Sequence, residues 1–155
     1  MRVAIFDFDG TLYEKETFKI LMDHLKNHPV YHTKYKQFYL SILPRYIGYK
    51  MKLYPEARMK ERSMQIYLSA LEDLSKDELD TYFKEVTEKM QEDFNPLVVS
   101  KLEQHIADDV HVMLVSGAYT SLIQNAINGF HFDTVIGSEI PFKDEYVDKD
   151  KDVYH

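Results

Sequence analysis

A short apolar run at the start of the chain constrains its fold more than any other feature. Residues 2–7 are mostly aliphatic or aromatic and end on a carboxylate, Asp7. A continuous apolar run of this length predicts a strand covered on both faces, as in a parallel sheet. Parallel strands need long crossover connections, so a fold of strands joined by helices is expected.

The apolar spacing becomes helical from Glu16 to about residue 93, beginning with Phe18, Leu21, Met22 and Leu25. We expect four helices in this segment. Pro44 is predicted to interrupt the second helix, and Pro55 to start the third. The pair Ser75 and Glu78 forms a capping box that starts the fourth helix, which should run to about residue 91.

The remainder of the chain returns to an alternation of strands and helices. We expect a helix that starts at Asn95-Pro96, followed by a strand over 110–115 that ends at Ser116-Gly117. The next helix should run to about residue 128, with Gly129 as its C-terminal cap. A strand over 132–136 and a hairpin over 140–147 should follow.

This order predicts an α/β protein with a parallel sheet and a separate all-helical cap inserted after the first strand. We place the α/β core at residues 1–14 and 94–155, and the cap at residues 15–93. Because the insert starts beyond the carboxyl end of the first strand, it begins where open α/β sheets bind ligands.

Two carboxylates follow the first strand closely, Asp7 and Asp9, and Gly10-Thr11 comes next. Two like charges this close are costly without a partner, and a divalent cation such as Mg²⁺ would relieve them. A nucleophilic carboxylate beside a second, protonatable one suits chemistry through an aspartyl phosphate. The alternative is an acidic turn or helix cap without a chemical role.

The segment from Asp7 to Leu12 resembles the first motif of the haloacid dehalogenase (HAD) superfamily, whose core is a Rossmann-type parallel sheet. The resemblance implies that Asp7 is the nucleophile and Asp9 the general acid and then base. It also implies Mg²⁺ bound by the Asp7 carboxylate and the Asp9 main-chain carbonyl, with Gly10 and Thr11 facing the phosphate. Dehalogenases generally lack the second Asp, so Asp9 favours phosphatase chemistry.

The apolar run ending at Ser116-Gly117 is similar to the second motif of that superfamily. The resemblance implies that Ser116 hydrogen-bonds the phosphoryl oxygens and that Gly117 adds an amide donor. The position of the cap is typical of the phosphoserine phosphatase-like subfamily. In that subfamily a Glu-Thr pair follows the first motif, and Glu16-Thr17 stands at that spacing, which implies Glu16 as a substrate-binding residue. Glu16 could equally be a helix-terminal acid favoured by the helix dipole.

The last two motifs of the superfamily, a basic residue and an acidic pair, have no clear counterpart after Ser116. Lys143 falls in the expected hairpin, and the charged block 148–152 follows no apolar strand, which suggests a solvated tail. We therefore expect a fragment or a shortened member with an open sheet edge, through which copies could associate. Two functions remain open: a phosphatase acting on a small phosphorylated metabolite, and a silent HAD-like binding or assembly module.

The composition excludes several kinds of chemistry and binding partner. The chain has no cysteine, which excludes disulfides and thiolate chemistry and fits a cytoplasmic protein. Its net charge of −7 argues against nucleic-acid binding. No apolar stretch is long enough to span a membrane, and the N-terminus lacks the features of a signal peptide, so no membrane partner is expected.

Charge and tyrosines are concentrated in the helical insert. Residues 31–62 hold eight Lys or Arg and two Glu, whereas residues 72–93 have a formal balance of −6. These segments could be solvated helical faces, or the basic one could attract an anionic ligand. Tyrosines interleaved with lysines could form a stacking surface for nucleic acid, but helical spacing favours their packing inside the cap or between the cap and the core. These residues are Tyr31, Tyr35, Tyr39, Tyr46, Tyr49 and Tyr54.

Overall fold

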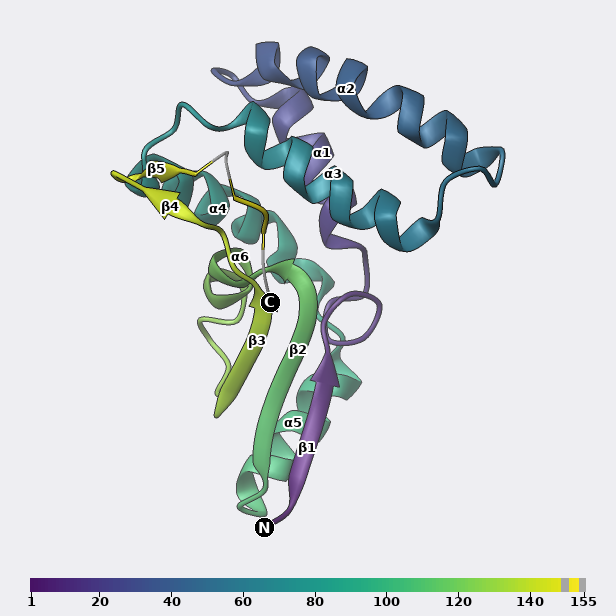
Figure 1. Cartoon of the computed structure of the whole chain (residues 1–155). Helices are drawn as coiled ribbons and strands as arrows, with labels where there is room; N and C mark the ends of the chain where they lie inside the picture. Colours follow the sequence, from purple (N-terminus) through teal and green to yellow (C-terminus); the bar gives the residue numbers. More distant parts are fainter. Residues whose placement is uncertain (149–150, 154–155) are drawn as a thin grey trace. The chain divides into compact units, whose positions relative to one another are not determined.

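The computed structural model describes residues 1–148 and 151–153 (Figure 1). The chain divides into two compact units. The core unit consists of Met1–Ile20 and Asp80–Ile140, and the cap unit of Leu21–Leu79 and Pro141–Val153. These divisions fall within two helices, whereas the sequence placed the limits of the helical insert at residues 15 and 93.

The core unit contains a three-stranded parallel sheet in the order β1-β2-β3. Its strands are β1 (Val3–Asp7), β2 (His111–Tyr119) and β3 (Thr134–Ser138). Figure 1 shows the three strands side by side, with their arrowheads at the same end. The α/β class and the insertion of helices after the first strand are confirmed.

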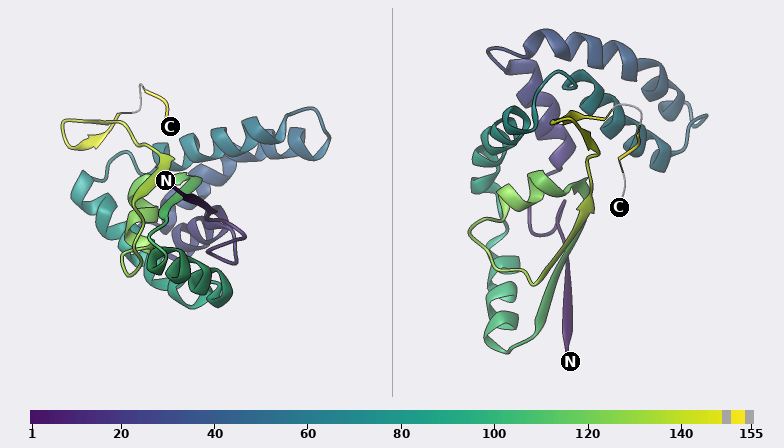
Figure 2. Two further views of the ribbon diagram at one scale, coloured as in Figure 1. Left: turned by 90° about the horizontal axis from the view of Figure 1, so that it is seen from below. Right: turned by 60° about the vertical axis from the view of Figure 1, so that its left-hand side comes forward.

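Only one face of this sheet is covered by the described residues of the core unit. Two of its helices, α5 (Pro96–Ala107) and α6 (Thr120–Ala126), lie on the same side of the sheet (right-hand view of Figure 2). The inward-facing Phe6, Val112 and Leu114 are at most 8% exposed. The opposite face presents Ile5 at 69% exposure, together with Val3, Val115 and Ile136. The prediction of a strand covered on both faces is therefore wrong within the described residues.

Local signals set the start of α5 but not the end of α6. The Asn95 side chain accepts a hydrogen bond from the Leu97 N–H at 3.0 Å, and Pro96 is the first helical residue, as expected. The helix α6 ends at Ala126, earlier than predicted. Gly129 does not adopt the positive φ of a C-terminal cap, so that prediction was wrong.

The cap unit is built mainly from α2 (His32–Lys50) and α3 (Glu56–Ala70), which form an antiparallel hairpin (Figure 1). Pro44 was expected to interrupt α2, but it lies inside the helix. A proline at this position removes one backbone hydrogen bond, and the packing of Phe38 and Ile42 in the cap interior outweighs that loss.

A tyrosine lies in the interior of the cap unit, but it is not one of the six predicted from helical spacing. Tyr67 on α3 is fully buried, donates its hydroxyl to the Leu21 carbonyl at 2.7 Å and contacts the Phe38 ring edge-on. By contrast, Tyr39 and Tyr46 are 46% and 45% exposed, and none of the six predicted tyrosines is buried. The prediction of interior packing is wrong for Tyr39 and Tyr46, because α2 carries apolar side chains around more than one face and α3 covers only one of them.

Two long helices connect the units along the chain: α1 (Thr17–Asn27) and α4 (Lys76–Met90), the latter followed by a 3-10 turn over Gln91–Asp93. The capping box before α4 is confirmed. The Glu78 N–H donates to the Ser75 hydroxyl at 3.2 Å, and the Ser75 N–H donates to the Glu78 carboxylate at 3.0 Å.

The predicted hairpin consists of β4 (Phe142–Lys143) and β5 (Tyr146–Val147) in the cap unit. Its two turn residues both have positive φ, 54° at Asp144 and 69° at Glu145, the combination that favours a tight hairpin turn. Beyond it, Asp148 is buried rather than solvated, and its N–H donates to the Pro141 carbonyl. Lys149 and Asp150 lie outside the described residues.

Among the helices of the described residues, none has the length and apolar content required to cross a bilayer.

Candidate active site

Two neighbouring strands bring the predicted motif residues to one edge of the sheet. Asp7 is the last residue of β1, is exposed, and lies opposite Val115 of β2 in the parallel register. Ser116 is therefore the next residue of β2 beyond that pair. Because parallel strands end at the same edge, Asp7 and Ser116 lie at the carboxyl edge, where α/β folds place their ligands.

The loop after β1 is closed by its own backbone. The N–H groups of Thr11 and Tyr13 both donate to the Phe8 carbonyl, at 3.1 Å and 3.0 Å. Gly10 has a φ of 73°, a conformation that other residues rarely adopt, and its N–H donates to the Lys15 carbonyl at 3.3 Å. The amides of Gly10 and Thr11 thus bond carbonyls within the chain, whereas the role predicted for the Thr11 hydroxyl in phosphate binding stays a prediction.

Buried aromatic side chains of the same loop also hold it in place. Phe8 and Tyr13 are fully buried and stack on each other with ring centroids 5.6 Å apart. The Leu12 carbonyl accepts a hydrogen bond from the Asn95 N–H at 2.8 Å. Since Phe8, Leu12 and Tyr13 of the loop are buried, Asp7 and Asp9 are held on a rigid turn at the end of β1.

Thr17, the first residue of α1, bonds directly to Asp9. Its N–H donates to the Asp9 Oδ1 at 3.2 Å, and its hydroxyl donates to the same oxygen. Thr17 is only 2% exposed, so these donors are shielded from water. The helix N-terminus and its first side chain therefore clamp one oxygen of Asp9.

The electrostatic surroundings of Asp9 favour its protonated form. Burial raises the pKa of the Asp9 carboxyl, and the negative charges of Asp7 and Glu16 raise it further. The two hydrogen bonds from Thr17 act in the opposite direction, but the pKa remains above its ordinary value. A carboxyl group with a raised pKa, beside an exposed carboxylate, has the properties of a general acid.

The residue that contacts Asp9 is Thr17, which the sequence analysis noted only as the neighbour of Glu16. Glu16 is exposed, and its negative charge raises the pKa of Asp9. The signal for Thr17 was present, because Thr at a helix start is a common donor and cap, but its partner eight residues earlier is set by the loop.

Ser116 and Gly117 form an irregular part of β2. The pairing of β2 with β3 shifts between Val115 and Tyr119, and bulges of this kind often re-aim a side chain beside an active site. Ser116 is 9% exposed, and its oxygen accepts a hydrogen bond from the Ala118 N–H at 3.1 Å, so its own O–H can donate to a ligand. The bulge is tied to β3, because the Ser138 hydroxyl donates to the Gly117 carbonyl.

No basic side chain in the described ranges forms a salt bridge with Asp7 or Asp9. The nearest lysine in sequence, Lys15, pairs instead with Asp93 at 3.3 Å. Lys143 lies in the hairpin of the cap unit. The negative charge at this edge thus has no neutralising partner among the residues that the structure describes.

The donors at this edge suit a hard divalent cation. Asp7 offers an exposed carboxylate, and the loop adds main-chain carbonyls, the oxygen ligands that Mg²⁺ prefers. The repulsion by which Asp7 raises the pKa of Asp9 is the kind that a bound cation relieves. The residues present therefore fit a magnesium ion.

Comparison with known families agrees with this arrangement. The model of the haloacid dehalogenase-like hydrolase family matches residues 4–153, nearly the whole chain. The chain belongs to this family. A search among curated protein sequences gave no match.

Solved structures share the HAD fold with this chain. A protein of unknown function from Bordetella pertussis Tohama I superimposes with a TM-score of 0.76 at 16% identity, over 98% of this chain and 66% of its own. A phospho-aspartyl intermediate analogue of phosphoserine phosphatase gives 0.53 at 18% identity, over 99% and 62%. Cytosolic 5'-nucleotidase IIIB bound to cytidine gives 0.54 at 14% identity, over 100% and 53%.

The resemblance to the HAD superfamily is thereby confirmed, and phosphoserine phosphatase is among the solved structures that share its fold. At these identities the solved structures support the fold, and the chain spans only 53–66% of the length of the three structures.

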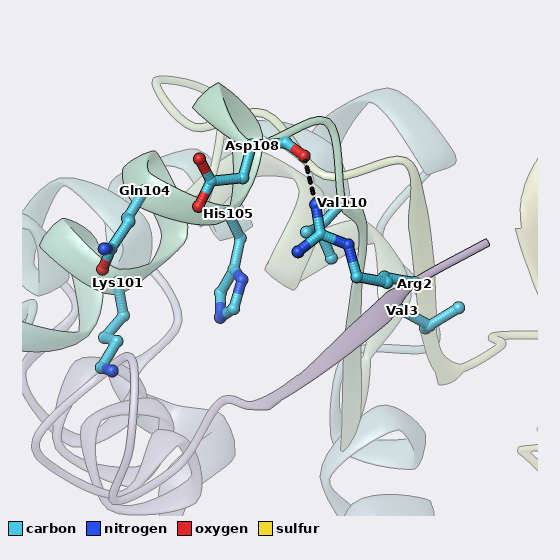
Figure 3. A pocket seen from close by; sticks show the side chains of 7 residues that line it. All are labelled: Arg2, Val3, Lys101, Gln104, His105, Asp108 and Val110. Carbon is cyan, nitrogen blue, oxygen red and sulfur yellow. Dashed lines mark hydrogen bonds between the residues drawn. The ribbon is translucent and has the colours of Figure 1, made fainter.

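A surface hollow of about 500 Å³ in the core unit lies away from the HAD motif. Figure 3 shows Arg2 and Val3 on one side of it and α5 residues on the other, with the Arg2 guanidinium donating to the Asp108 carbonyl at 2.9 Å. Val3 begins β1, whereas Asp7 ends it. The hollow therefore lies at the amino end of the strand, and the candidate active site at the carboxyl end.

Proposed function

We propose that this chain carries the catalytic motif of a Mg²⁺-dependent phosphatase that hydrolyses phosphomonoesters through an aspartyl phosphate on Asp7. The observation that carries the proposal is the pair of acids with different environments: Asp7 is exposed, whereas the pKa of Asp9 is raised by burial. A carboxyl group with a raised pKa can act as the acid while an exposed carboxylate beside it acts as the nucleophile.

In the first step an Asp7 oxygen attacks phosphorus, and the bond from phosphorus to the ester oxygen breaks. Asp9 gives its proton to the departing alkoxide, which leaves as an alcohol. We expect the Ser116 hydroxyl to donate to a phosphoryl oxygen, whose charge the site must stabilise. Proton transfer by a positioned side chain contributes typically about 10²–10⁴-fold to the rate.

In the second step a water molecule attacks the phosphorus of the aspartyl phosphate. Asp9, now a carboxylate, takes a proton from that water, and the bond from phosphorus to the Asp7 oxygen breaks. The products are inorganic phosphate and the original Asp7 carboxylate. The clamp by Thr17 keeps Asp9 in one position during both proton transfers.

Mg²⁺ would be held by the Asp7 carboxylate and the Asp9 main-chain carbonyl. When bound, it neutralises phosphate charge so that an anionic carboxylate can approach an anionic ester.

We propose as substrate a small phosphorylated metabolite of the amine-bearing kind to which phosphoserine belongs. Support comes from Glu16, an exposed carboxylate at the start of α1 that is close enough to affect the pKa of Asp9. A carboxylate there could pair with a cationic group on the substrate. The absence of cysteine supports a cytoplasmic location for this activity.

The test is release of phosphate from phosphoserine, p-nitrophenyl phosphate and a nucleoside monophosphate, with Mg²⁺ and with a chelator. We expect Mg²⁺-dependent turnover that Asp7→Asn abolishes and that Asp23→Asn, a change of an exposed acid on α1, leaves unaltered. Turnover that survives Asp7→Asn would contradict the proposal.

The rival function is a catalytically silent HAD-like module, and a specific observation favours it: no salt bridge reaches Asp7 from the residues that the structure describes. Beryllium fluoride separates the two possibilities, since it forms an adduct only on a carboxylate competent to accept a phosphoryl group. We expect the ¹⁹F signal of a bound adduct in the presence of Mg²⁺, lost in Asp7→Asn.

We also propose self-association through the free edge of β1. Within the described residues β1 pairs only with β2, so one row of its backbone groups has no strand partner. Sedimentation velocity is expected to show a dimer that Ile5→Lys, at an exposed position of β1, converts to monomer. A wild-type monomer at high concentration would contradict this.

A further inference from the structure

The turn that joins α2 to α3 exposes large apolar side chains. We name residues 45–54 the α2–α3 tip. Within it Ile47, Met51 and Leu53 are 49%, 64% and 76% exposed, and Tyr46 is 45% exposed. Single exposed apolar residues are common on protein surfaces, but several within one turn mark an interaction site.

The tip is an ordered turn, which fixes the direction of these side chains. The N–H groups of Met51, Lys52 and Leu53 donate to carbonyls in the last turns of α2, at distances of 3.0 Å, 3.0 Å and 2.8 Å. Lys52 adopts a positive φ of 62°, which closes the turn. Because the backbone groups are satisfied locally, the apolar side chains are presented on a preformed surface.

The tip is also basic. It contains Arg45, Lys50 and Lys52 and no acidic residue, although the whole chain has a net charge of −7. The Lys50 Nζ lies 5.5 Å from the centre of the Tyr46 ring and 5.9 Å from that of Tyr49. The Lys50 side chain therefore lies beside these two rings. The following turns of α3 add exposed Arg58, Lys60 and Arg62 together with exposed Glu56 and Glu61, and Lys60 pairs with Glu56 at 3.7 Å.

Exposed aliphatic groups, tyrosines and lysines in one turn match the layers of an anionic bilayer surface. Aliphatic groups enter the acyl boundary, tyrosines lie at the level of the headgroups, and lysines contact the phosphates. A nucleic acid would use the cations and the rings but would leave Ile47, Met51 and Leu53 in water.

We propose that the α2–α3 tip docks the protein on an anionic lipid bilayer without crossing it. This goes beyond the phosphatase proposal and does not depend on it. It replaces the expectation that the protein has no membrane partner, which rested on the absence of a spanning segment. The basic residues of the tip then contact a lipid surface, and the exposed Tyr46 forms part of that contact.

The test is co-sedimentation of the full chain with vesicles of phosphatidylcholine alone and of phosphatidylcholine with phosphatidylglycerol. We expect binding only to the anionic vesicles, weakened by salt because surface charges are screened. The double variant Lys50→Gln/Lys52→Gln should bind about 25-fold more weakly, at about fivefold per basic residue. Met51→Ser/Leu53→Ser should weaken binding by at least about tenfold through lost apolar burial.

The matched control is Leu97→Ser/Lys101→Gln on α5, which changes an exposed apolar and an exposed basic residue outside the tip. It should bind as the wild type does, and circular dichroism should show that all variants remain folded. The proposal is overturned if the anionic vesicles bind no protein, or if the tip variants bind as well as the control. It is also overturned if sedimentation shows an oligomer that Met51→Ser/Leu53→Ser dissolves, because the tip would then join copies of the chain.

Discussion

Thr17→Val removes the hydroxyl that donates to Asp9 and changes little else. Thr17 is 2% exposed, and valine has nearly the same shape, so the packing around it is preserved. The backbone N–H of residue 17, 3.2 Å from the Asp9 Oδ1, remains in place. The substitution therefore isolates one hydrogen bond to one carboxyl oxygen.

The expected loss depends on the charge of Asp9. A hydrogen bond to a charged group contributes about 1.5–3 kcal/mol net, against about 0.5–1.5 kcal/mol for a neutral one. Because Asp9 is only partly buried, we expect the free energy of unfolding to fall by about 1.5 kcal/mol at neutral pH and by less at acidic pH. The hydroxyl bond lowers the pKa of Asp9, so its extra stabilisation is present above the titration and is lost as the pH falls through it.

The assay is urea unfolding of the wild type and the variant at neutral pH and at the lowest pH where both remain folded. Thr17→Ser, which keeps the hydroxyl, is the control and should show no such pH-dependent difference. In single-turnover kinetics the alkaline limb of the pH–rate profile should move to higher pH in Thr17→Val, since its Asp9 stays protonated further. An equal loss of stability at both pH values would refute the assignment of the bond to the Asp9 carboxylate.

Three further predictions concern the neighbouring residues and the cap. Ser116→Ala should lower the rate of Asp7 phosphorylation by about 10²-fold, the usual effect of losing one donor to a developing oxyanion. The control Ser69→Ala on α3 should leave this rate unchanged. A Ser116→Ala rate equal to that of the wild type would show that Ser116 is not part of the site. Glu16→Gln should change the ranking of phosphomonoester substrates by kcat/KM and leave p-nitrophenyl phosphate unaffected; an unchanged ranking across the panel would show that Glu16 does not select the substrate. Ser75→Ala should lower the free energy of unfolding by about 1 kcal/mol through loss of the cap on α4, measured by urea unfolding; Ser41→Ala, within α2, should cost less.

Features with a local cause were predictable from the sequence. The start of α5 depends on Asn95 and its neighbours, and the start of α4 on Ser75 and Glu78, four residues apart at most. The position of Asp7 at the end of β1 follows from an apolar run that stops at a carboxylate. In each of these cases the interacting groups are adjacent in sequence, so tertiary packing does not decide the outcome.

Features decided by packing were not predictable in the same way. Pro44 stays inside α2 because side chains of that helix pack in the cap interior. Gly129 does not cap α6, since the helix ends earlier, at Ala126. The direction of Tyr39 and Tyr46 depends on which face of α2 is covered by α3. A helix with apolar residues on several faces leaves that choice open.

The candidate site falls between these two cases. Its acids and Ser116 were located by motif, and parallel register brings their strands together. The bond from Thr17 to Asp9 spans eight residues of a loop whose path depends on Gly10 and on the buried aromatic rings beneath it. The path of the loop is set by three-dimensional packing. The same packing therefore sets the burial of Asp9, its hydrogen bonds from Thr17 and the direction in which its pKa shifts.

The most direct test of the central claim is detection of phosphate on Asp7. In the Asp9→Asn variant, p-nitrophenyl phosphate can still phosphorylate Asp7, because its leaving group needs little help from an acid. The aspartyl phosphate should then accumulate, because the variant lacks the base that activates water for its hydrolysis. Incubation with this substrate and Mg²⁺, followed by rapid acid quench and mass spectrometry, should show one phosphoryl group on the peptide that contains Asp7. No phosphoryl group on that peptide, under conditions where the wild type releases p-nitrophenol, would contradict Asp7 as the nucleophile.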